Sequence, residues 1–416
     1  MRLLESTAVR FMVRFRRHIF SVIMLGVVVT LGLWNVAVET QGGGQIPTYR
    51  FDPDWPKPLP VVGNGQSTSR QQVTGGVGTH CIDSRDHVIQ FNRAYLNPDR
   101  FATDSTTPAP PVIELDPDGN IVNSWGSATL GPEGRSAVLP DNTHGCFVDY
   151  EDNIWVGGNS DGVVQKWTHD GQTMLLQIGT KGICDGPATL SPDSPYPTCG
   201  APGNNSSRTL LNEAADVSVD PNPDPVTGER GSVYVADGYG NHRIVVFNSQ
   251  GEYLRQWGSA GTGSGQFYPT GGGHPHCVAL SNDGLLYTCD RQANRIQVFD
   301  RVGNLKRIIS VIPPGTSPSG GVTVERSVSD IAFSRDPDQT LIYVVYYGCG
   351  CASPEGGRVY IISRETGAIV GRIGGPGAEG GNFLSAHSIS LDSKGNVYVG
   401  ESPMGRRTQR FLKVAD

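Results

Sequence analysis

Charged residues are scarce in this chain of 416 residues, where they make up 18%. Long surface helices need many Glu, Lys and Arg side chains, so this scarcity argues against a helical protein. Glycine (55 residues) and proline (29 residues) are frequent instead, which favours many short strands joined by turns. Hydrophobic residues account for 37%, which excludes a chain that is disordered over most of its length.

Basic residues are also few beyond the N-terminus. Residues 1–18 contain five Arg and one Glu, and the remaining chain carries 28 Lys and Arg against 39 Asp and Glu. A region this acidic is a poor partner for DNA or RNA phosphates. We therefore expect no nucleic-acid partner.

A long uncharged run extends from Ile19 to Val38, and twenty residues are enough to cross a membrane as a helix. The Arg-rich residues 1–18 predict a basic cytoplasmic tail, because positive charges stay on the cytoplasmic side. We expect a transmembrane signal anchor at residues 19–38, with the following chain periplasmic or extracellular. The alternative is a cleaved signal peptide, which would leave a secreted protein.

The eight cysteines fit such a compartment, because disulfides persist there. Cys184 and Cys199 flank a loop rich in Pro, Ser and Asp. Cys277 and Cys289 would face each other in a hairpin that turns at Asp283. These two pairs are predicted disulfides, and zinc-knuckle spacing is absent. The sequence does not indicate how the other four cysteines pair: Cys81, Cys146, Cys349 and Cys351.

The remaining chain repeats one pattern. Each copy has a run of β-forming residues that begins at an apolar, usually aromatic, residue, then a polar loop, a second run, a turn and a third run. A further short strand precedes each copy. Four short antiparallel strands per unit are typical of a propeller blade. Six copies start at or near these residues: Ile89, Trp155, Tyr234, Tyr287, Tyr343 and Tyr398.

The copies resemble NHL repeats. They predict an all-β fold, a six-bladed β-propeller over residues 71–416, that follows the N-terminal transmembrane helix. Residues 39–70 are expected to be a linker, although residues 49–51 could supply a strand that closes the ring.

Three histidines occupy the same place in alternate blades. His144, His276 and His387 each lie eleven residues before the aromatic residue that opens the next strand. First strands line the centre of a propeller, so the three imidazoles would converge there. Three His ligands with an open fourth position are typical of a catalytic zinc site, and copper or nickel would also accept them. We call this place the channel position; in the other blades it holds Gly78, Ala215 and Ser329.

The end of the second strand lies on the same face of a propeller as the start of the first. Tyr239 stands there in blade three, and Arg93 and Arg291 occupy equivalent places in blades one and four. The two Arg side chains are expected to face each other across the channel mouth, where they could clamp a carboxylate. Tyr239 near a divalent cation could act as a base.

Three segments resemble successive blades of peptidyl-α-hydroxyglycine α-amidating lyase (peptidylamidoglycolate lyase), within a similarity that covers about residues 75–410. They are DGYGNHRIVVF at 237–247, GQFYPTGGGHPHCVAL at 265–280 and DRQANRIQVF at 290–299. The resemblance implies that zinc is held by His144, His276 and His387. It also implies that Tyr239, Arg93 and Arg291 are active-site residues. The implied reaction cleaves the C–N bond of a small, peptide-like α-hydroxyamide to give an amide and glyoxylate.

The sequence departs from that family at three places. The family has an Asp calcium ligand directly after the third His, a Met two residues before that His, and a Cys after the active-site Tyr. This chain has Ser388, Ser385 and Gly240 there, so structural calcium is not expected. The alternative function is a non-catalytic, membrane-anchored NHL propeller that binds a protein or glycan. A lactonase-type propeller is less favoured, because those sites use Glu, Asp and Asn ligands.

Overall fold

The computed structural model describes seven stretches of the chain: 46–63, 69–93, 105–127, 136–190, 196–313, 327–348 and 357–414. These stretches contain 29 strands and no α-helix. The predicted transmembrane segment at residues 19–38 lies outside them. Within the described stretches, no helix has the length and apolar character that crossing a membrane requires.

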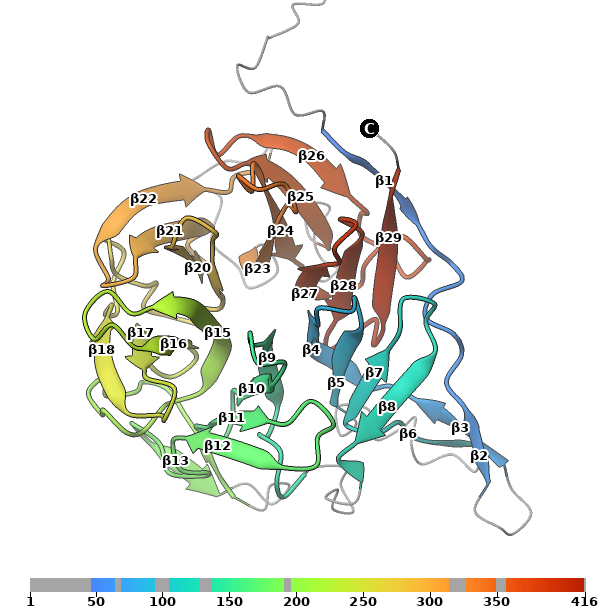
Figure 1. The fold of residues 1–416 in the computed structure, drawn as a ribbon, viewed down its shortest axis with the longest axis horizontal. Helices are drawn as coiled ribbons and strands as arrows, with labels where there is room; N and C mark the ends of the chain where they lie inside the picture. The colour runs from blue at the N-terminus through green and yellow to red at the C-terminus, as the bar shows by residue number, and fades with distance from the viewer. Residues whose placement is uncertain are drawn as a thin grey trace, which may run out of the picture. The chain divides into compact units, whose positions relative to one another are not determined.

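Most strands belong to six four-stranded antiparallel sheets, the blades, which surround a common centre in Figure 1. Blade one contains β4 (Gly76–Ile82), β5 (Val88–Arg93), β7 (Val112–Leu115) and β8 (Ile121–Trp125). Blade two contains β9 (Thr143–Val148), β10 (Ile154–Gly158), β11 (Val164–Trp167) and β12 (Met174–Ile178). Blade three contains β15 (Ala214–Pro223), β16 (Arg230–Asp237), β17 (Arg243–Phe247) and β18 (Tyr253–Trp257).

The other three blades follow the same order. Blade four contains β19 (Val278–Leu280), β20 (Leu285–Asp290), β21 (Arg295–Asp300) and β22 (Leu305–Ser310). Blade five contains β23 (Ser327–Phe333), β24 (Leu341–Tyr347), β25 (Arg358–Ser363) and β26 (Ile369–Ile373). Blade six contains β27 (Ala386–Leu391), β28 (Val397–Glu401), β29 (Thr408–Val414) and β1 (Thr48–Phe51).

Two small sheets lie outside the blades. One contains β2 (Val61–Gly63), β3 (Ser69–Val73) and β6 (Thr106–Pro108), and the other contains β13 (Ala188–Leu190) and β14 (Pro197–Cys199).

The ring closes through the two ends of the described chain. The strand expected at residues 49–51 is β1, which pairs antiparallel with β29 as the outer strand of blade six. The Tyr49 and Tyr343 hydroxyl oxygens lie 2.6 Å apart, which ties β1 to blade five. Contacts between β27 and β4 join the last blade to the first. The fold is therefore a six-bladed β-propeller, as the repeats predicted.

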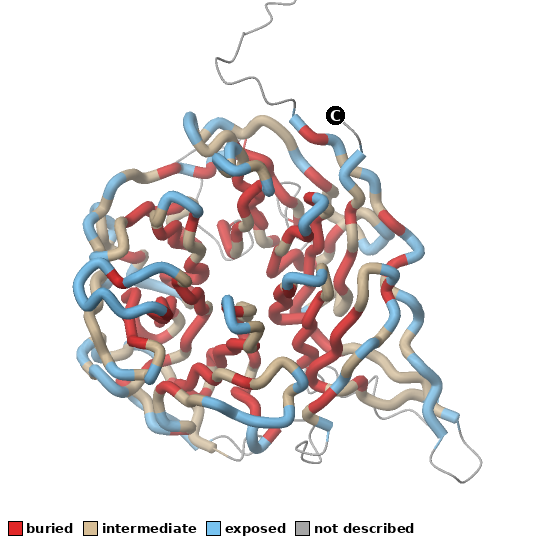
Figure 2. The backbone as a smooth tube through the Cα atoms, in the orientation of Figure 1, coloured by how far each residue is buried: buried red, intermediate tan, exposed pale blue. Residues whose placement is uncertain are grey.

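The core lies between neighbouring blades. Inner strands are buried, whereas outer strands are partly exposed (Figure 2). Trp155, an aromatic residue that opens a second strand, is 1% exposed and packs among Val217 and Val233 of blade three. Burying a large side chain of this kind contributes about 2–3 kcal/mol. The repeated aromatic residues therefore hold blade against blade.

Three disulfides are present among the described residues. The predicted pairs Cys184–Cys199 and Cys277–Cys289 are both formed. Cys277 directly precedes β19 and Cys289 lies in β20, and the turn between these strands at residues 281–284 is the one the sequence indicated. A third disulfide joins Cys81 of blade one to Cys146 of blade two. Two cysteines lie outside the described residues: Cys349 and Cys351.

Candidate functional site

The structure brings the three histidines of the channel position together. His144 lies at the start of β9, His387 at the start of β27, and His276 two residues before β19. Their ring centroids are 4.7, 4.7 and 5.2 Å apart. One ring nitrogen from each histidine lies within 4.8 Å of those of the other two. The side chains are buried, so the cluster lies inside the ring.

Backbone carbonyls of the intervening blades hold these rings. Nδ1 of each histidine lies within hydrogen-bonding distance of the carbonyl at the channel position of the next blade. A carbonyl oxygen can only accept, so Nδ1 carries the hydrogen and the Nε2 lone pair stays available. The intervening blades therefore contribute backbone oxygens at the channel position, and the alternate blades contribute imidazoles. The acceptors for His144, His276 and His387 are Ala215 (2.5 Å), Ser329 (2.6 Å) and Gly78 (2.8 Å).

The three imidazoles are neutral. Burial lowers the pKa of each one well below its usual value, and nearby His and Arg side chains lower it further. A neutral imidazole with a free Nε2 is the form that binds a metal. Three such nitrogens at this spacing fit zinc or a similar divalent transition metal.

Tyr239 reaches the same centre from the loop that follows β16. Its hydroxyl oxygen lies 3.1 Å from His144 Nε2 and 2.9 Å from His276 Nε2. Arg291 donates a hydrogen bond from Nη1 to this hydroxyl at 3.2 Å. The Arg291 guanidinium also stacks on the Tyr347 ring, 4.7 Å from its centroid. A hydroxyl and a cation therefore adjoin the histidines.

Arg93 lies at the end of β5 and is 6% exposed. Its Nε and Nη2 donate to the carbonyl of Thr143, at 2.8 and 2.7 Å, directly before His144. The charges of both Arg93 and Arg291 lower the pKa of His144 and of His387, so both guanidinium groups lie near the centre. Arg93 also donates from Nη1 to Ser402 Oγ at 3.4 Å.

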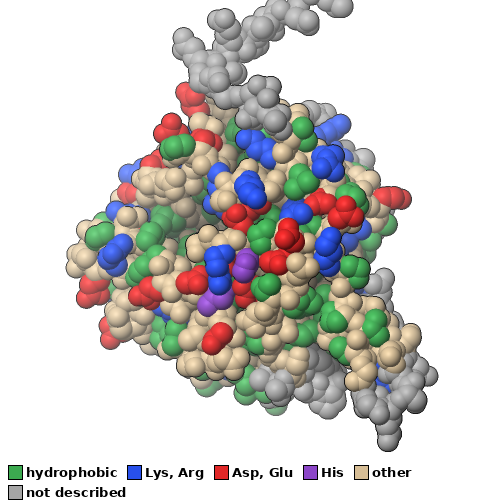
Figure 3. Space-filling view, turned by 45° about the vertical axis from the view of Figure 1, so that its right-hand side comes forward, with side chains coloured by type: hydrophobic (Ala, Val, Ile, Leu, Met, Phe, Trp, Pro, Cys, Tyr) green, Lys and Arg blue, Asp and Glu red, His purple; other side chains and the backbone are tan. Residues whose placement is uncertain are grey.

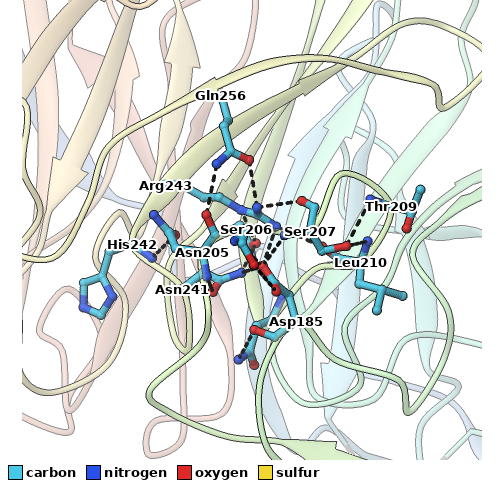
Figure 4. Close-up of polar contacts among 12 residues, drawn as sticks. Asp185, Asn205, Ser206, Ser207, Thr209, Leu210, Asn241, His242, Arg243 and Gln256 are labelled. Carbon is cyan, nitrogen blue, oxygen red and sulfur yellow. Dashed lines mark hydrogen bonds and ion pairs between the residues drawn. The ribbon is translucent and has the colours of Figure 1, made fainter.

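A buried ion cluster holds the Tyr239 loop. Arg243, which is fully buried, donates from Nε to Asp237 at 2.9 Å, and its Nη2 lies 3.3 Å from Asp185. Figure 4 shows Arg243 among Asp185, Asn241 and Gln256. Asp237 ends β16 two residues before Tyr239. The cluster therefore fixes the point from which the Tyr239 loop leaves the sheet.

Two acidic residues at the centre were not predicted. Asp216 and Asp330 each follow the channel position, in blades three and five, and line a central cavity of about 390 Å³. Burial raises the pKa of Asp330 to about 7, and burial with the charge of Asp330 raises the pKa of Asp216. The signal in the sequence was an Asp directly after Ala215 and after Ser329.

The substituted family positions make internal contacts. Ser388 Oγ lies 2.9 Å from His80 Nδ1. Ser385 donates from its hydroxyl to the Met404 carbonyl at 2.6 Å. Both side chains are therefore engaged within the protein.

Comparisons with known proteins agree with this arrangement. The NHL repeat family matches residues 273–299, in blade four. The chain is 28% identical over 364 residues to peptidyl-glycine alpha-amidating monooxygenase B of Xenopus laevis, which covers 84% of this chain and 34% of that protein. It is 24% identical over 264 residues to peptidyl-alpha-hydroxyglycine alpha-amidating lyase 1 of Drosophila melanogaster, with 61% and 40% covered.

This chain is thus similar to the NHL repeat in one blade and to proteins named as α-amidating lyases over much of its length. It spans about a third or less of the length of the first curated relatives that it matches. It is also 23% identical over 262 residues to human NHL repeat-containing protein 3, which covers 61% of this chain and 57% of that protein.

Proposed function

We propose that this NHL propeller is a zinc-dependent lyase. It would cleave the C–N bond of a peptidyl α-hydroxyglycine, or of a related α-hydroxyamide, to release an amide and glyoxylate. The observation that carries the proposal is the convergence of Tyr239 and Arg291 on the histidine cluster. Similarity to proteins named as α-hydroxyglycine amidating lyases supports it.

The histidines would hold the metal. His144, His276 and His387 present neutral, oriented Nε2 atoms, so they fit zinc or another divalent transition metal. When bound, such an ion supplies a Lewis acid for oxygen ligands. Ser388 stands where the resemblance would place a calcium ligand, and its hydroxyl oxygen contacts His80 instead.

The arginines would bind the carboxylate of the substrate. Arg291 is oriented by stacking on Tyr347 and already donates toward the centre. Arg93 is held by the Thr143 carbonyl on the opposite side of the ring. A guanidinium group can bind a carboxylate through two parallel hydrogen bonds and stabilise developing negative charge.

Tyr239 would act as the base. Its phenolate form would take the proton from the substrate hydroxyl, and that oxygen would form the aldehyde C=O of glyoxylate as the C–N bond breaks. The electron pair of that bond would go to the amide nitrogen, which would receive the proton held by Tyr239, so that Tyr239 returns to the phenolate. The hydrogen bond from Arg291 to the Tyr239 oxygen supports this role, because a carboxylate bound by Arg291 would lie next to the base.

We also propose that the propeller is extracytoplasmic and anchored by residues 19–38. Three disulfides support an oxidising compartment, and the basic segment before the uncharged run supports this orientation. Protease added to spheroplasts should then digest the propeller without lysis. Protection until lysis would contradict this topology.

The lyase activity can be tested by glyoxylate release from a peptide ending in α-hydroxyglycine. Tyr239→Phe should lower turnover at least about 100-fold and leave the metal content unchanged, because a general base contributes that much. Tyr150→Phe is the matched control, since Tyr150 is 46% exposed. Arg291→Ala should raise KM and lower kcat.

The second candidate is a binding propeller, which the similarity to NHL repeat-containing protein 3 favours. A fully metallated protein that releases no glyoxylate above the spontaneous rate, from several peptides and related hydroxyamides, would support it and contradict the lyase proposal.

A further inference from the structure

A second group of metal-binding side chains lies where blades one and two meet. Asp83 and His87 belong to the turn between β4 and β5, and Glu114 belongs to β7. Asp152 lies in the turn between β9 and β10, and His169 in the turn between β11 and β12. We call these residues and Arg85 the rim cluster.

The rim cluster lies on the face opposite the three histidines. The channel histidine His144 starts β9, whereas the turn with Asp152 follows the far end of that strand. Five residues of extended strand, from His144 to Asp149, span about 16 Å. The rim cluster is therefore separate from the site proposed for the lyase.

The donor atoms have the spacing of metal ligands. Glu114 Oε1 lies 2.6 Å from His87 Nδ1 and 3.3 Å from His169 Nε2. Asp83 Oδ2 lies 3.7 Å from that His87 nitrogen and 3.6 Å from that His169 nitrogen. Neighbouring ligands on a tetrahedral zinc ion, with bonds of about 2.0–2.1 Å, are about 3.3 Å apart. Small side-chain movements would thus complete a coordination sphere.

The cluster is shielded and rich in acceptors. The Asp83 side chain is fully buried, Glu114 is 6% exposed, and the His87 and His169 side chains are 18% exposed. Asp152 is more open, with a side chain that is 45% exposed, and its Oδ1 lies 3.3 Å from His169 Nδ1. The four inner donors are thus largely screened from solvent, and Asp152 contacts the His169 nitrogen that faces away from them.

Arg85 now occupies the place of a cation. Its Nη2 lies 2.7 Å from Asp83 Oδ2 and 2.6 Å from His169 Nε2. A guanidinium N–H can only donate, so His169 Nε2 accepts, and its lone pair points into the cluster. The Arg85 side chain is 51% exposed, so it can turn into solvent.

Charge also favours a divalent ion. Three carboxylates face the single guanidinium of Arg85: Arg85 Nη2 lies 2.7 Å from Asp83, 3.5 Å from Glu114 and 3.9 Å from Asp152. The acidic side chains of the rim cluster therefore outnumber its one permanent cation. Among the described histidines, only His87 and His169 are not buried. Figure 3 shows His side chains at the surface beside basic and acidic side chains.

We infer that the rim cluster is a second metal site, in which Asp83, His87, Glu114 and His169 bind a divalent transition metal such as zinc and displace Arg85. Two imidazole and two carboxylate donors suit zinc better than calcium, which prefers six or more oxygens. The ion would join blade one to blade two, as the Cys81–Cys146 disulfide also does. The inference does not depend on the lyase activity.

The test is a zinc titration of the native, chelator-treated protein by calorimetry, with zinc content measured after dialysis. We expect two zinc ions per chain. His169→Ala and Glu114→Gln should each lose one, whereas Asp170→Asn should keep both, because Asp170 hydrogen-bonds only Thr168 and Gln172 outside the cluster. His276→Ala should lose the other ion and keep the rim ion, which separates this result from failure of the lyase proposal.

Arg85→Gln separates a metal site from a purely structural ion cluster. Removing the competing charge should tighten the rim site at least about tenfold and leave the central site unchanged. A structural cluster would instead lose stability and bind no additional zinc. Equal zinc content in the native protein, His169→Ala and Glu114→Gln, or no tightening in Arg85→Gln, would overturn the inference.

Discussion

Replacing Gly78 with Ala would place a methyl group on the Arg93 guanidinium. A Cβ atom at Gly78 would lie 2.2 Å from Arg93 Nε and 2.4 Å from Cζ. Gly78 has no left-handed backbone conformation that would penalise Ala by itself. The whole effect of the substitution therefore depends on moving Arg93.

The cost follows from the contacts that Arg93 would lose. Its guanidinium is flexible enough to avoid the methyl group, but it is 6% exposed and donates twice to the Thr143 carbonyl. Hydrogen bonds from a charged group contribute about 1.5–3 kcal/mol, and overpacking costs about 1–3 kcal/mol. We expect Gly78→Ala to lower the free energy of unfolding by about 2–3 kcal/mol. Because Thr143 precedes His144, kcat/KM should also fall.

Urea unfolding of Gly78→Ala, Arg93→Ala and the double variant measures this coupling. In the Arg93→Ala background, Gly78→Ala should cost less than about 0.5 kcal/mol, because the guanidinium is gone. Gly63→Ala is the matched control, since no atom lies within 4 Å of its Cβ. Additive effects of the two substitutions would refute the reasoning.

Two further predictions concern the surroundings of Tyr239. Arg243→Gln should lower the free energy of unfolding by about 3–5 kcal/mol in urea, because it leaves the buried Asp237 and Asp185 carboxylates without their cation; a change below about 1 kcal/mol would contradict this. Burial, together with the charge of Asp237, raises the pKa of Glu213 to about 8 in the folded protein. The unfolded chain loses this proton at a lower pH, so the free energy of unfolding should decrease as the pH rises from about 4.5 to 8. Unfolding of Glu213→Gln at pH 5 and pH 8 should show a smaller fall, and equal falls would exclude this role.

The repeat made the propeller and its central histidines predictable from sequence. In a ring of similar blades, equal places in the sequence repeat become equal places around the axis. Counting eleven residues back from Trp155, Tyr287 and Tyr398 therefore located three side chains that the structure brings together. The carbonyl braces that orient the rings were not predictable, because backbone groups leave no residue-specific signal.

Contacts between residues at different positions of the repeat could not be predicted from the sequence. Cys81 and Cys146 are separated by 65 residues and meet only because neighbouring first strands lie side by side. His87 lies in the turn between the first and second strands of blade one, whereas His169 lies in the turn between the third and fourth strands of blade two. The two residues therefore do not occupy corresponding positions in the repeat. Predicting such sites requires the distances between blades, which the spacing of residues in the sequence does not give.

The three blades without a central histidine contribute to the centre through their backbone. Each intervening blade contributes a carbonyl oxygen, and any residue provides one, so blade three can use Ala215 where blade five uses Ser329. Blade one is different, because the Arg93 guanidinium fills the space that a side chain would take. Glycine there lets one blade brace His387 and, through Arg93, hold the chain before His144. The orientation of His387 and of His144 thus depends on the absence of a side chain at Gly78.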